Sequence, residues 1–227
     1  PAYPPPRAIR PLAVAGDTDL DCDVCVVGSG AGGGTAAAVL ATAGLDVVVL
    51  EAGGDYDDAD FDGNERDGWR RLYAQGGASA TNDQSVGLLA GSCLGGSTIV
   101  NYTTAFRTPD DVRAEWAAHG VPAFASESFT QSLDAVWSRL GVNLDHNHRS
   151  PRDDVFGRGL EALGWHCEPM PRNVRGCDQT GPECGWCGFG CRRGAKQSTL
   201  KTWLADADAA GARILVDTAA RRVLVER

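Results

Sequence analysis

The stretch from residue 177 to residue 191 carries four cysteines at short spacings. Cys184, Cys187 and Cys191 lie in CGWCGFGC, and Cys177 precedes them by seven residues. Four thiolates at turn-compatible spacings suit a tetrahedral zinc or an iron–sulfur cluster. The same spacings also fit a compact loop of buried thiols, or a disulfide bond that braces the turn. The residues themselves leave these three alternatives open.

A second candidate site is the glycine-rich turn that follows the run CDVCVV. Gly28, Gly30 and Gly33 form the pattern G-x-G-x-x-G, and the small Ala37 follows where a helix must pack on a strand. In this pattern the first glycine makes a tight turn, the second lets the main chain approach a diphosphate, and the helix N-terminus supplies N–H groups. Glu51 ends the next apolar run, where its carboxylate can accept hydrogen bonds from ribose hydroxyls. The sequence therefore predicts a dinucleotide site.

These residues need a βαβ unit to position them, and residues 22–53 provide one. A short β-branched run, a glycine-dense turn, a helix of small residues ending at Gly44 and the run DVVVL follow in order. RILVD and RRVLVE near the end are two further candidate strands. A doubly wound sheet usually has about five or six strands. We therefore predict an α/β, Rossmann-like fold whose sheet is incomplete in this chain.

Three helices are expected from the spacing of apolar residues. The first ends at Gly141, the second begins at Ser150 and Pro151, and the third is capped by Ser198. Their apolar faces contain Phe129, Leu133, Val136, Trp137 and Leu140 in the first, Val155, Phe156, Leu160 and Leu163 in the second, and Leu200, Trp203, Leu204 and Ala207 in the third. The aromatic residues of the first two helices are expected in the core. Cys22 and Cys25, although spaced C-x-x-C, are also expected to be plain core. Residues 1–20 are rich in proline and predict an extended arm that lies on another element.

Composition excludes several classes of partner. The net charge of -9 opposes any long basic surface, so neither nucleic acid nor an anionic membrane is expected as a partner. No apolar run is long enough to span a membrane, and the N-terminus lacks the apolar core of a signal peptide. We therefore expect a cytoplasmic protein, in which the eight cysteines would be reduced or bound to metal.

The loop GSCLGGSTIVN at residues 91–101 resembles the flavin loop of the glucose-methanol-choline (GMC) oxidoreductases. The resemblance implies FAD as the cofactor, with the backbone at Gly95, Gly96 and Ser97 passing close to the flavin and Asn101 lying along its ring. Glycine permits such close approach, and an amide can both donate and accept at a ring edge. Thr104, three residues beyond this stretch, is also expected to bind the cofactor.

Further stretches resemble the long-chain fatty alcohol oxidase branch of the same family. These are LYAQGGASATND at 72–83, TPDDVRAEWAAHGV at 108–121 and the segment 184–217. The resemblance implies oxidation of a long-chain primary alcohol to an aldehyde by hydride transfer to flavin N5. It also implies an adenine contact near Ala220. Residues 21–227 are then expected to be the N-terminal part of the FAD-binding domain, with the flavin loop at 91–109, a helical insertion at 110–170 and the cysteine-rich loop at 177–191.

No catalytic residue is predicted in this chain. The family's base is a histidine in the C-terminal half, and the four histidines here, His119, His146, His148 and His166, match no such motif. We therefore expect the remainder of the enzyme to be needed for activity on a small-molecule alcohol. One alternative is a non-catalytic module in which FAD and the cysteine cluster relay electrons to a partner. Another is an FAD dehydrogenase that passes electrons through an iron–sulfur cluster at the cysteine-rich loop.

Overall fold

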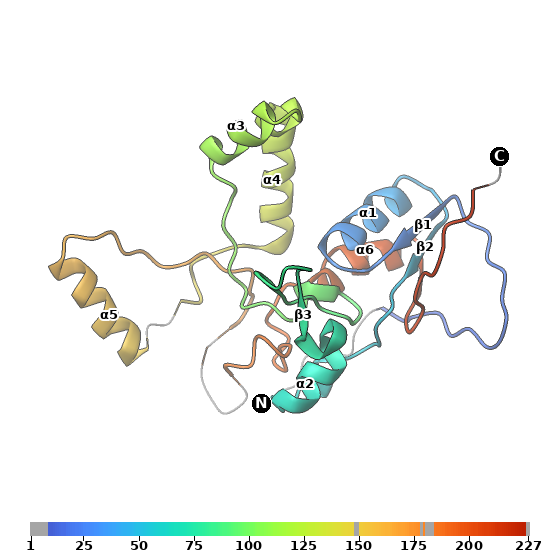
Figure 1. The fold of residues 1–227 in the computed structure, drawn as a ribbon, viewed down its shortest axis with the longest axis horizontal. Coiled ribbons are helices and arrows are strands. Elements are labelled where there is room, and N and C mark those ends of the chain that lie inside the picture. Colours follow the sequence, from blue (N-terminus) through green and yellow to red (C-terminus); the bar gives the residue numbers. More distant parts are fainter. Residues whose placement is uncertain (1–8, 148–149, 178, 180–183, 226–227) are drawn as a thin grey trace. The chain divides into compact units, whose positions relative to one another are not determined.

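The computed structural model describes residues 9–147, 150–177, 179 and 184–225. The chain divides into two compact units. The first unit contains residues 1–102 and 180–227, and the second contains residues 103–179. Figure 1 shows the course of the chain.

A three-stranded parallel sheet organises the first unit. Its strands are β1 (Val24–Val27), β2 (Val47–Leu50) and β5 (Arg213–Leu215), in the order β1-β2-β5. Val26 is paired with Val49, and Val49 with Ile214. The helix α1 (Ala31–Thr42) connects β1 to β2 and packs beside α6 (Trp203–Ala209), as Figure 1 shows. The predicted βαβ unit and the Rossmann-like class are therefore confirmed.

Small and branched side chains form the core of this unit. The buried set includes Ala37, Ala38, Ala41, Val47, Val49, Leu204, Ala207 and Ile214. Alanines along one side of α1 let the helices lie close together, and each fully buried valine or leucine contributes about 1.5–3 kcal/mol to folding. The described part of the N-terminal arm joins this core, because Ile9 is buried and the Leu12 N–H donates to the Ile214 carbonyl across 2.7 Å.

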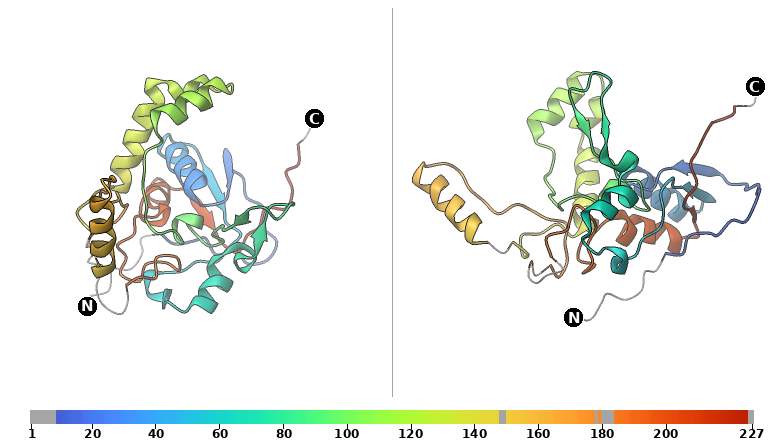
Figure 2. Two further views of the ribbon diagram at one scale, coloured as in Figure 1. Left: turned by 60° about the vertical axis from the view of Figure 1, so that its left-hand side comes forward. Right: turned by 60° about the horizontal axis from the view of Figure 1, so that its bottom comes forward.

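The remaining elements of the first unit are short. They are η1 (Asp58–Asp60), α2 (Glu65–Leu72), η2 (Ala74–Gly77), η3 (Gly96–Thr98), η5 (Thr199–Lys201), and a hairpin of β3 (Ser79–Ala80) and β4 (Gly87–Leu88) that Figure 2 shows from two sides. Ser198 stands at the N-cap of η5 rather than of a long helix, and its side chain makes no capping hydrogen bond.

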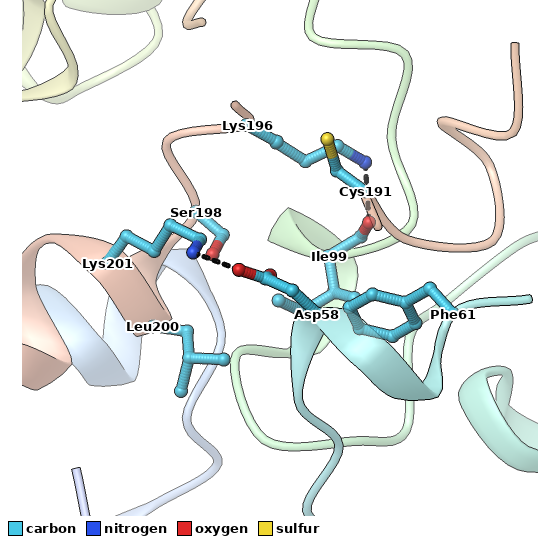
Figure 3. A pocket seen from close by; sticks show the side chains of 8 residues that line it. All are labelled: Asp58, Phe61, Ile99, Cys191, Lys196, Ser198, Leu200 and Lys201. Carbon is cyan, nitrogen blue, oxygen red and sulfur yellow. Dashed lines mark hydrogen bonds and ion pairs between the residues drawn. The ribbon is translucent and has the colours of Figure 1, made fainter. Parts of the chain in front are cut away.

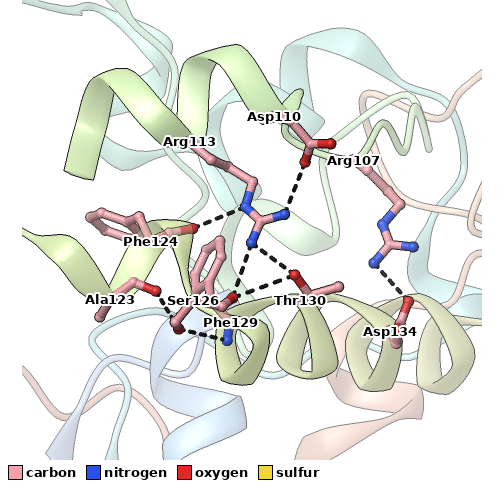
Figure 4. A network of polar contacts seen from close by, with 9 residues as sticks. All are labelled: Arg107, Asp110, Arg113, Ala123, Phe124, Ser126, Phe129, Thr130 and Asp134. Atoms are coloured by element: carbon pink, nitrogen blue, oxygen red, sulfur yellow. Dashed lines mark hydrogen bonds and ion pairs between the residues drawn. The ribbon is translucent and has the colours of Figure 1, made fainter. Parts of the chain in front are cut away.

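The second unit is helical. It contains α3 (Asp110–Ala118), η4 (Pro122–Ala125), α4 (Glu127–Leu140) and α5 (Pro151–Ala162). Two predicted boundaries are confirmed: Gly141 ends α4 with φ +60°, and Ser150 opens α5 with a capping box. The buried guanidinium of Arg113 joins α3 to α4 by donating to Phe124 O, Ser126 O and Thr130 Oγ1, as Figure 4 shows.

Three expectations about burial and strands were wrong. Phe156 is exposed, although it was expected in the core, and Val155 and Leu163 on the same helix face are exposed with it. Cys25 is exposed as well, because β1 is an edge strand and one of its faces is uncovered in the described residues. Residues 221–225 form no strand.

None of the helices in the described ranges has both the length and the apolar composition that crossing a lipid bilayer requires.

Candidate cofactor site

The glycine turn between β1 and α1 has the geometry of a phosphate-binding turn. Gly28 has φ +89°, a conformation that favours glycine. A Cβ on Gly33 would lie 1.9 Å from the Gly28 carbonyl oxygen, so a glycine is required where α1 crosses the end of β1. Gly30 is the N-cap of α1, without a side-chain cap and without an acidic residue in the first turn. The helix N-terminus therefore offers backbone N–H groups and a positive dipole end to a diphosphate.

The Glu51 carboxylate lies beside this turn and is almost fully buried. Its Oε2 accepts from the Ser29 N–H at 2.9 Å and from the Ser29 hydroxyl at 2.6 Å, and its Oε1 accepts from the Gly53 N–H at 2.9 Å. A carboxylate has about four lone-pair sites, so Oε1 retains capacity for one further donor. This arrangement fits the predicted hydrogen bond to a ribose hydroxyl.

The flavin loop and the glycine turn are in direct backbone contact. A Cβ on Gly96 would lie 2.9 Å from the Gly30 Cα, and the Gly95 N–H donates to the Ser29 hydroxyl across 2.9 Å. Both Gly95 and Gly96 have positive φ, at +92° and +53°. The structure thus brings together two turns that are far apart in the sequence, and their exposed backbone could hold one extended ligand.

Hydroxyl groups complete this junction. Thr199 Oγ1 lies 3.2 Å from Ser29 O and 3.3 Å from Gly95 O, and Thr98 Oγ1 donates to Gly95 O at 2.6 Å. The Thr199 N–H in turn donates to Thr98 Oγ1 at 3.1 Å. Sequence reasoning missed Ser29, Thr98 and Thr199. Ser29 could have been found from its place inside G-x-G, whereas Thr199 gives no signal because its partners lie far away in the chain.

The other predicted cofactor residues have the following places. Ser97 is exposed and its Oγ accepts from the Gly91 N–H, while Asn101 Nδ2 donates to the carbonyls of Ser97 and Thr98. Ala220 is exposed in the coil after β5, two residues beyond Thr218, whose N–H donates to Glu51 O. Thr104 lies in the second unit and is exposed. The predicted contacts of these residues with the cofactor stay predictions.

A thiol is buried inside the flavin loop. Cys93 is almost fully buried, and burial, with a smaller effect from the nearby Glu51, raises the pKa of its thiol to about 12. Cys93 is therefore neutral at physiological pH and acts as a small apolar side chain.

The four cysteines of the cysteine-rich loop do not form a metal centre in the described residues. No group of three or more His, Cys, Asp or Glu side chains among them is placed to hold a metal ion, and Cys177 belongs to the second unit. None of the eight cysteines forms a disulfide bond. Cys177, Cys184, Cys187 and Cys191 are half-buried, whereas the second alternative expected buried thiols.

Glycines and aromatic rings hold the loop in place instead. The Trp186 ring covers Gly63, where a Cβ would meet it at 2.3 Å, and the Phe189 ring lies edge-on to Trp69 at 5.4 Å. Cys191 lines a small pocket together with Asp58, Phe61, Ile99, Lys196, Ser198, Leu200 and Lys201 (Figure 3). The loop is thus packed against the segment that contains η1 and α2.

The described histidines all lie in the second unit. His119 ends α3, His146 Nε2 accepts from the Gly176 N–H at 3.1 Å, and His166 lies 3.3 Å from Glu168 on the surface. His148 lies outside the described residues. No base is assigned among them.

A parallel sheet with a glycine turn at the N-terminus of α1 and an acidic residue at the end of β2 defines a dinucleotide-binding protein of the Rossmann-like class. A family described as NAD(P)-binding Rossmann-like domain matches residues 26–65. The family described as GMC oxidoreductase matches residues 69–227, and the chain belongs to that family. The predicted membership of the GMC family is thereby confirmed, and the family together with the Rossmann-like domain points to FAD.

Long-chain-alcohol oxidases are similar to this protein along nearly the whole chain. A long-chain-alcohol oxidase of Arabidopsis thaliana, FAO4B, is 44% identical over 210 residues, which cover 90% of this chain and 27% of that protein. A second one, FAO3, is 39% identical over 226 residues, or 97% of this chain and 30% of that protein. The chain thus spans less than a third of the length of these relatives.

The fold matches a solved structure of the same architecture. The crystal structure of pyridoxine 4-oxidase from Mesorbium loti superposes with a TM-score of 0.62 at 18% identity, covering 91% of this chain and 44% of that one. At this identity the likeness concerns the fold.

Proposed function

We propose that this chain is the FAD-binding part of an oxidoreductase that converts a long-chain primary alcohol to its aldehyde. The observation that carries the proposal is the backbone contact between the Gly28–Gly33 turn and the Gly95–Gly96 turn, with Glu51 tied to both through Ser29. The identity to long-chain-alcohol oxidases supports the choice of substrate class.

Different residues of the candidate site would hold different parts of the cofactor. The N-terminus of α1 binds the diphosphate, Glu51 Oε1 accepts from a ribose hydroxyl, and the Gly95–Gly96 backbone permits close approach of the flavin ring. The FAD that these residues would hold would supply a hydride acceptor, flavin N5, for the alcohol carbon, and the hydroxyl proton would pass to a base. The base is not among the residues assigned here.

Three measurements test the proposal. Purified protein is expected to carry visible flavin absorbance, and Glu51→Gln is expected to weaken FAD binding because one oxygen acceptor and the negative charge are lost. Addition of a long-chain primary alcohol under anaerobic conditions to the whole oxidoreductase, of which this chain is proposed to be a part, is expected to bleach the flavin, while the alkane of equal length leaves it unchanged. Absence of flavin binding contradicts the proposal as a whole, and binding without bleaching favours a non-catalytic FAD module.

A further inference from the structure

Lys196 is a buried lysine that links two loops of the first unit. Its side chain is almost completely shielded from solvent, and Nζ donates to the backbone carbonyls of Ile99 at 2.5 Å, Asn101 at 2.7 Å and Cys187 at 2.5 Å. The first two carbonyls belong to the flavin loop and the third to the cysteine-rich loop. A buried ammonium is costly unless its donors are satisfied, and three carbonyls match the three N–H donors.

Tyr73 makes a second link between the same two loops. Its buried hydroxyl lies 2.6 Å from Gly188 O and 3.2 Å from Val100 O. Val100 stands between the two flavin-loop residues that Lys196 contacts, and Gly188 follows Cys187. Both links therefore join the same two short stretches of backbone.

Gly188 and Phe189 make further contacts beside the Tyr73 link. A Cβ on Gly188 would lie 2.9 Å from the Tyr102 hydroxyl, which is closer than real Cβ contacts. Phe189 then packs edge-on to Tyr73 with ring centroids 6.2 Å apart. Such aromatic pairs contribute about 0.5–1.5 kcal/mol beyond their buried area.

We propose that the cysteine-rich loop is a clamp that positions the flavin loop through Lys196 and Tyr73. The clamp acts through backbone carbonyls of residues 187 and 188, and it fixes the main-chain path at residues 99–101. That path places Asn101, so Lys196 and Tyr73 are positioning residues for the flavin ring. The role of Asn101 rests on the proposed function, whereas the clamp itself rests on the contacts above.

Lys196→Met tests the clamp, with Lys201→Met as the matched control. The control removes a lysine that lines the same pocket but pairs with the Asp58 carboxylate at 2.5 Å (Figure 3). We expect Lys196→Met to weaken FAD binding at least about tenfold, because hydrogen bonds to a charged group are lost. We expect the control to change binding by about threefold or less, as for a partly exposed ion pair. Quenching of flavin fluorescence gives the affinity, and the visible circular dichroism of the bound flavin reports its orientation.

A second variant guards against a failure of Lys196→Met to fold. Tyr73→Phe keeps the ring and removes the hydroxyl, so we expect a folded protein with faster backbone hydrogen exchange at residues 99–101 and an altered flavin circular dichroism spectrum. The clamp would be overturned if Tyr73→Phe, and Lys196→Met where it folds, kept the FAD affinity, the flavin circular dichroism spectrum and the hydrogen exchange of the wild-type protein. If the wild-type protein binds no FAD, the proposed function fails. The clamp can still be tested without FAD, because faster hydrogen exchange at residues 99–101 in the variants supports it and unchanged exchange contradicts it.

Discussion

The Ser29 hydroxyl lies 2.6 Å from Oε2 of Glu51 and at the same time accepts the N–H of Gly95 across 2.9 Å. One buried hydroxyl thus connects the acidic residue at the end of β2 to the flavin loop. Because the bond to the carboxylate is charge-assisted, it is stronger than a bond between neutral groups. The glycine turn and the flavin loop are therefore held together by Ser29, which was not among the predicted cofactor-binding residues.

Ser29→Ala is expected to destabilise the protein and to weaken FAD binding. The change leaves the Gly95 N–H without its acceptor and removes one donor from Glu51, which costs about 1.5–3 kcal/mol. Chemical unfolding measures the free energy, and flavin fluorescence measures the affinity. Thr35→Ala is the control, because the Thr35 hydroxyl donates to Ala31 O within its own helix. Equal effects of the two variants would show that Ser29 does not couple the loops.

Alanine at Gly33 and alanine at Gly32 are expected to have opposite effects. A Cβ at Gly33 meets the Gly28 carbonyl oxygen at 1.9 Å, so α1 must shift, at a cost of about 1–3 kcal/mol. A Cβ at Gly32 meets nothing within 4 Å, and alanine stabilises a helix by about 1 kcal/mol relative to glycine. Thermal unfolding of the protein without added cofactor distinguishes them. A stable Gly33→Ala variant would mean that α1 does not cross β1 as described.

Two glycines of the cysteine-rich loop provide a similar comparison. Gly185 and Gly190 have nearly equal φ angles, +97° and +96°, so the backbone strain of an alanine is the same at both. A Cβ at Gly190 would lie 2.3 Å from the Phe61 ring, whereas at Gly185 it meets nothing within 4 Å. We expect Gly190→Ala to unfold at lower denaturant concentration than Gly185→Ala. Indistinguishable midpoints would contradict the packing of the loop on Phe61.

The buried Cys93 thiol predicts a loss of stability at alkaline pH. Its pKa is raised from 9.0 to about 12, so the folded state holds the proton more tightly than the unfolded state. This contribution to stability is complete below pH 9 and is lost as the pH rises through 12, at about 1.4 kcal/mol for each pH unit. Unfolding by denaturant at several pH values from 8 upward measures the slope, and Cys93→Ala is expected to reduce it.

In native protein at pH 8, a thiol reagent is expected to modify the exposed Cys25 and Cys167 and to leave Cys93 unmodified.

Much of the candidate site could be predicted because its signals are local. Gly28 adopts a positive φ in a tight turn, Gly33 lies where α1 crosses the end of β1, and Glu51 directly follows β2. Each of these positions favours a particular residue type, and the sequence shows these types at a fixed spacing. The helix boundaries at Gly141 and Ser150 were predicted for the same reason, since caps act on the nearest turn of backbone. Burial was predicted less well, because the spacing that gave Val155 and Phe156 an apolar face does not say whether another element covers it.

The sequence by itself determined the cofactor turn, the family and the positions of the main helices, because these depend on short-range backbone geometry and on side-chain periodicity. Tertiary structure decided that the Gly30 and Gly96 turns touch, that Ser29 joins Glu51 to Gly95, and that Lys196 holds the cysteine-rich loop to the flavin loop. It also showed that the cysteine-rich loop packs through glycines and aromatic rings, and that no metal-holding group of side chains forms there among the described residues. These contacts join residues up to about 120 positions apart, and such pairings depend on how the chain packs rather than on any local pattern.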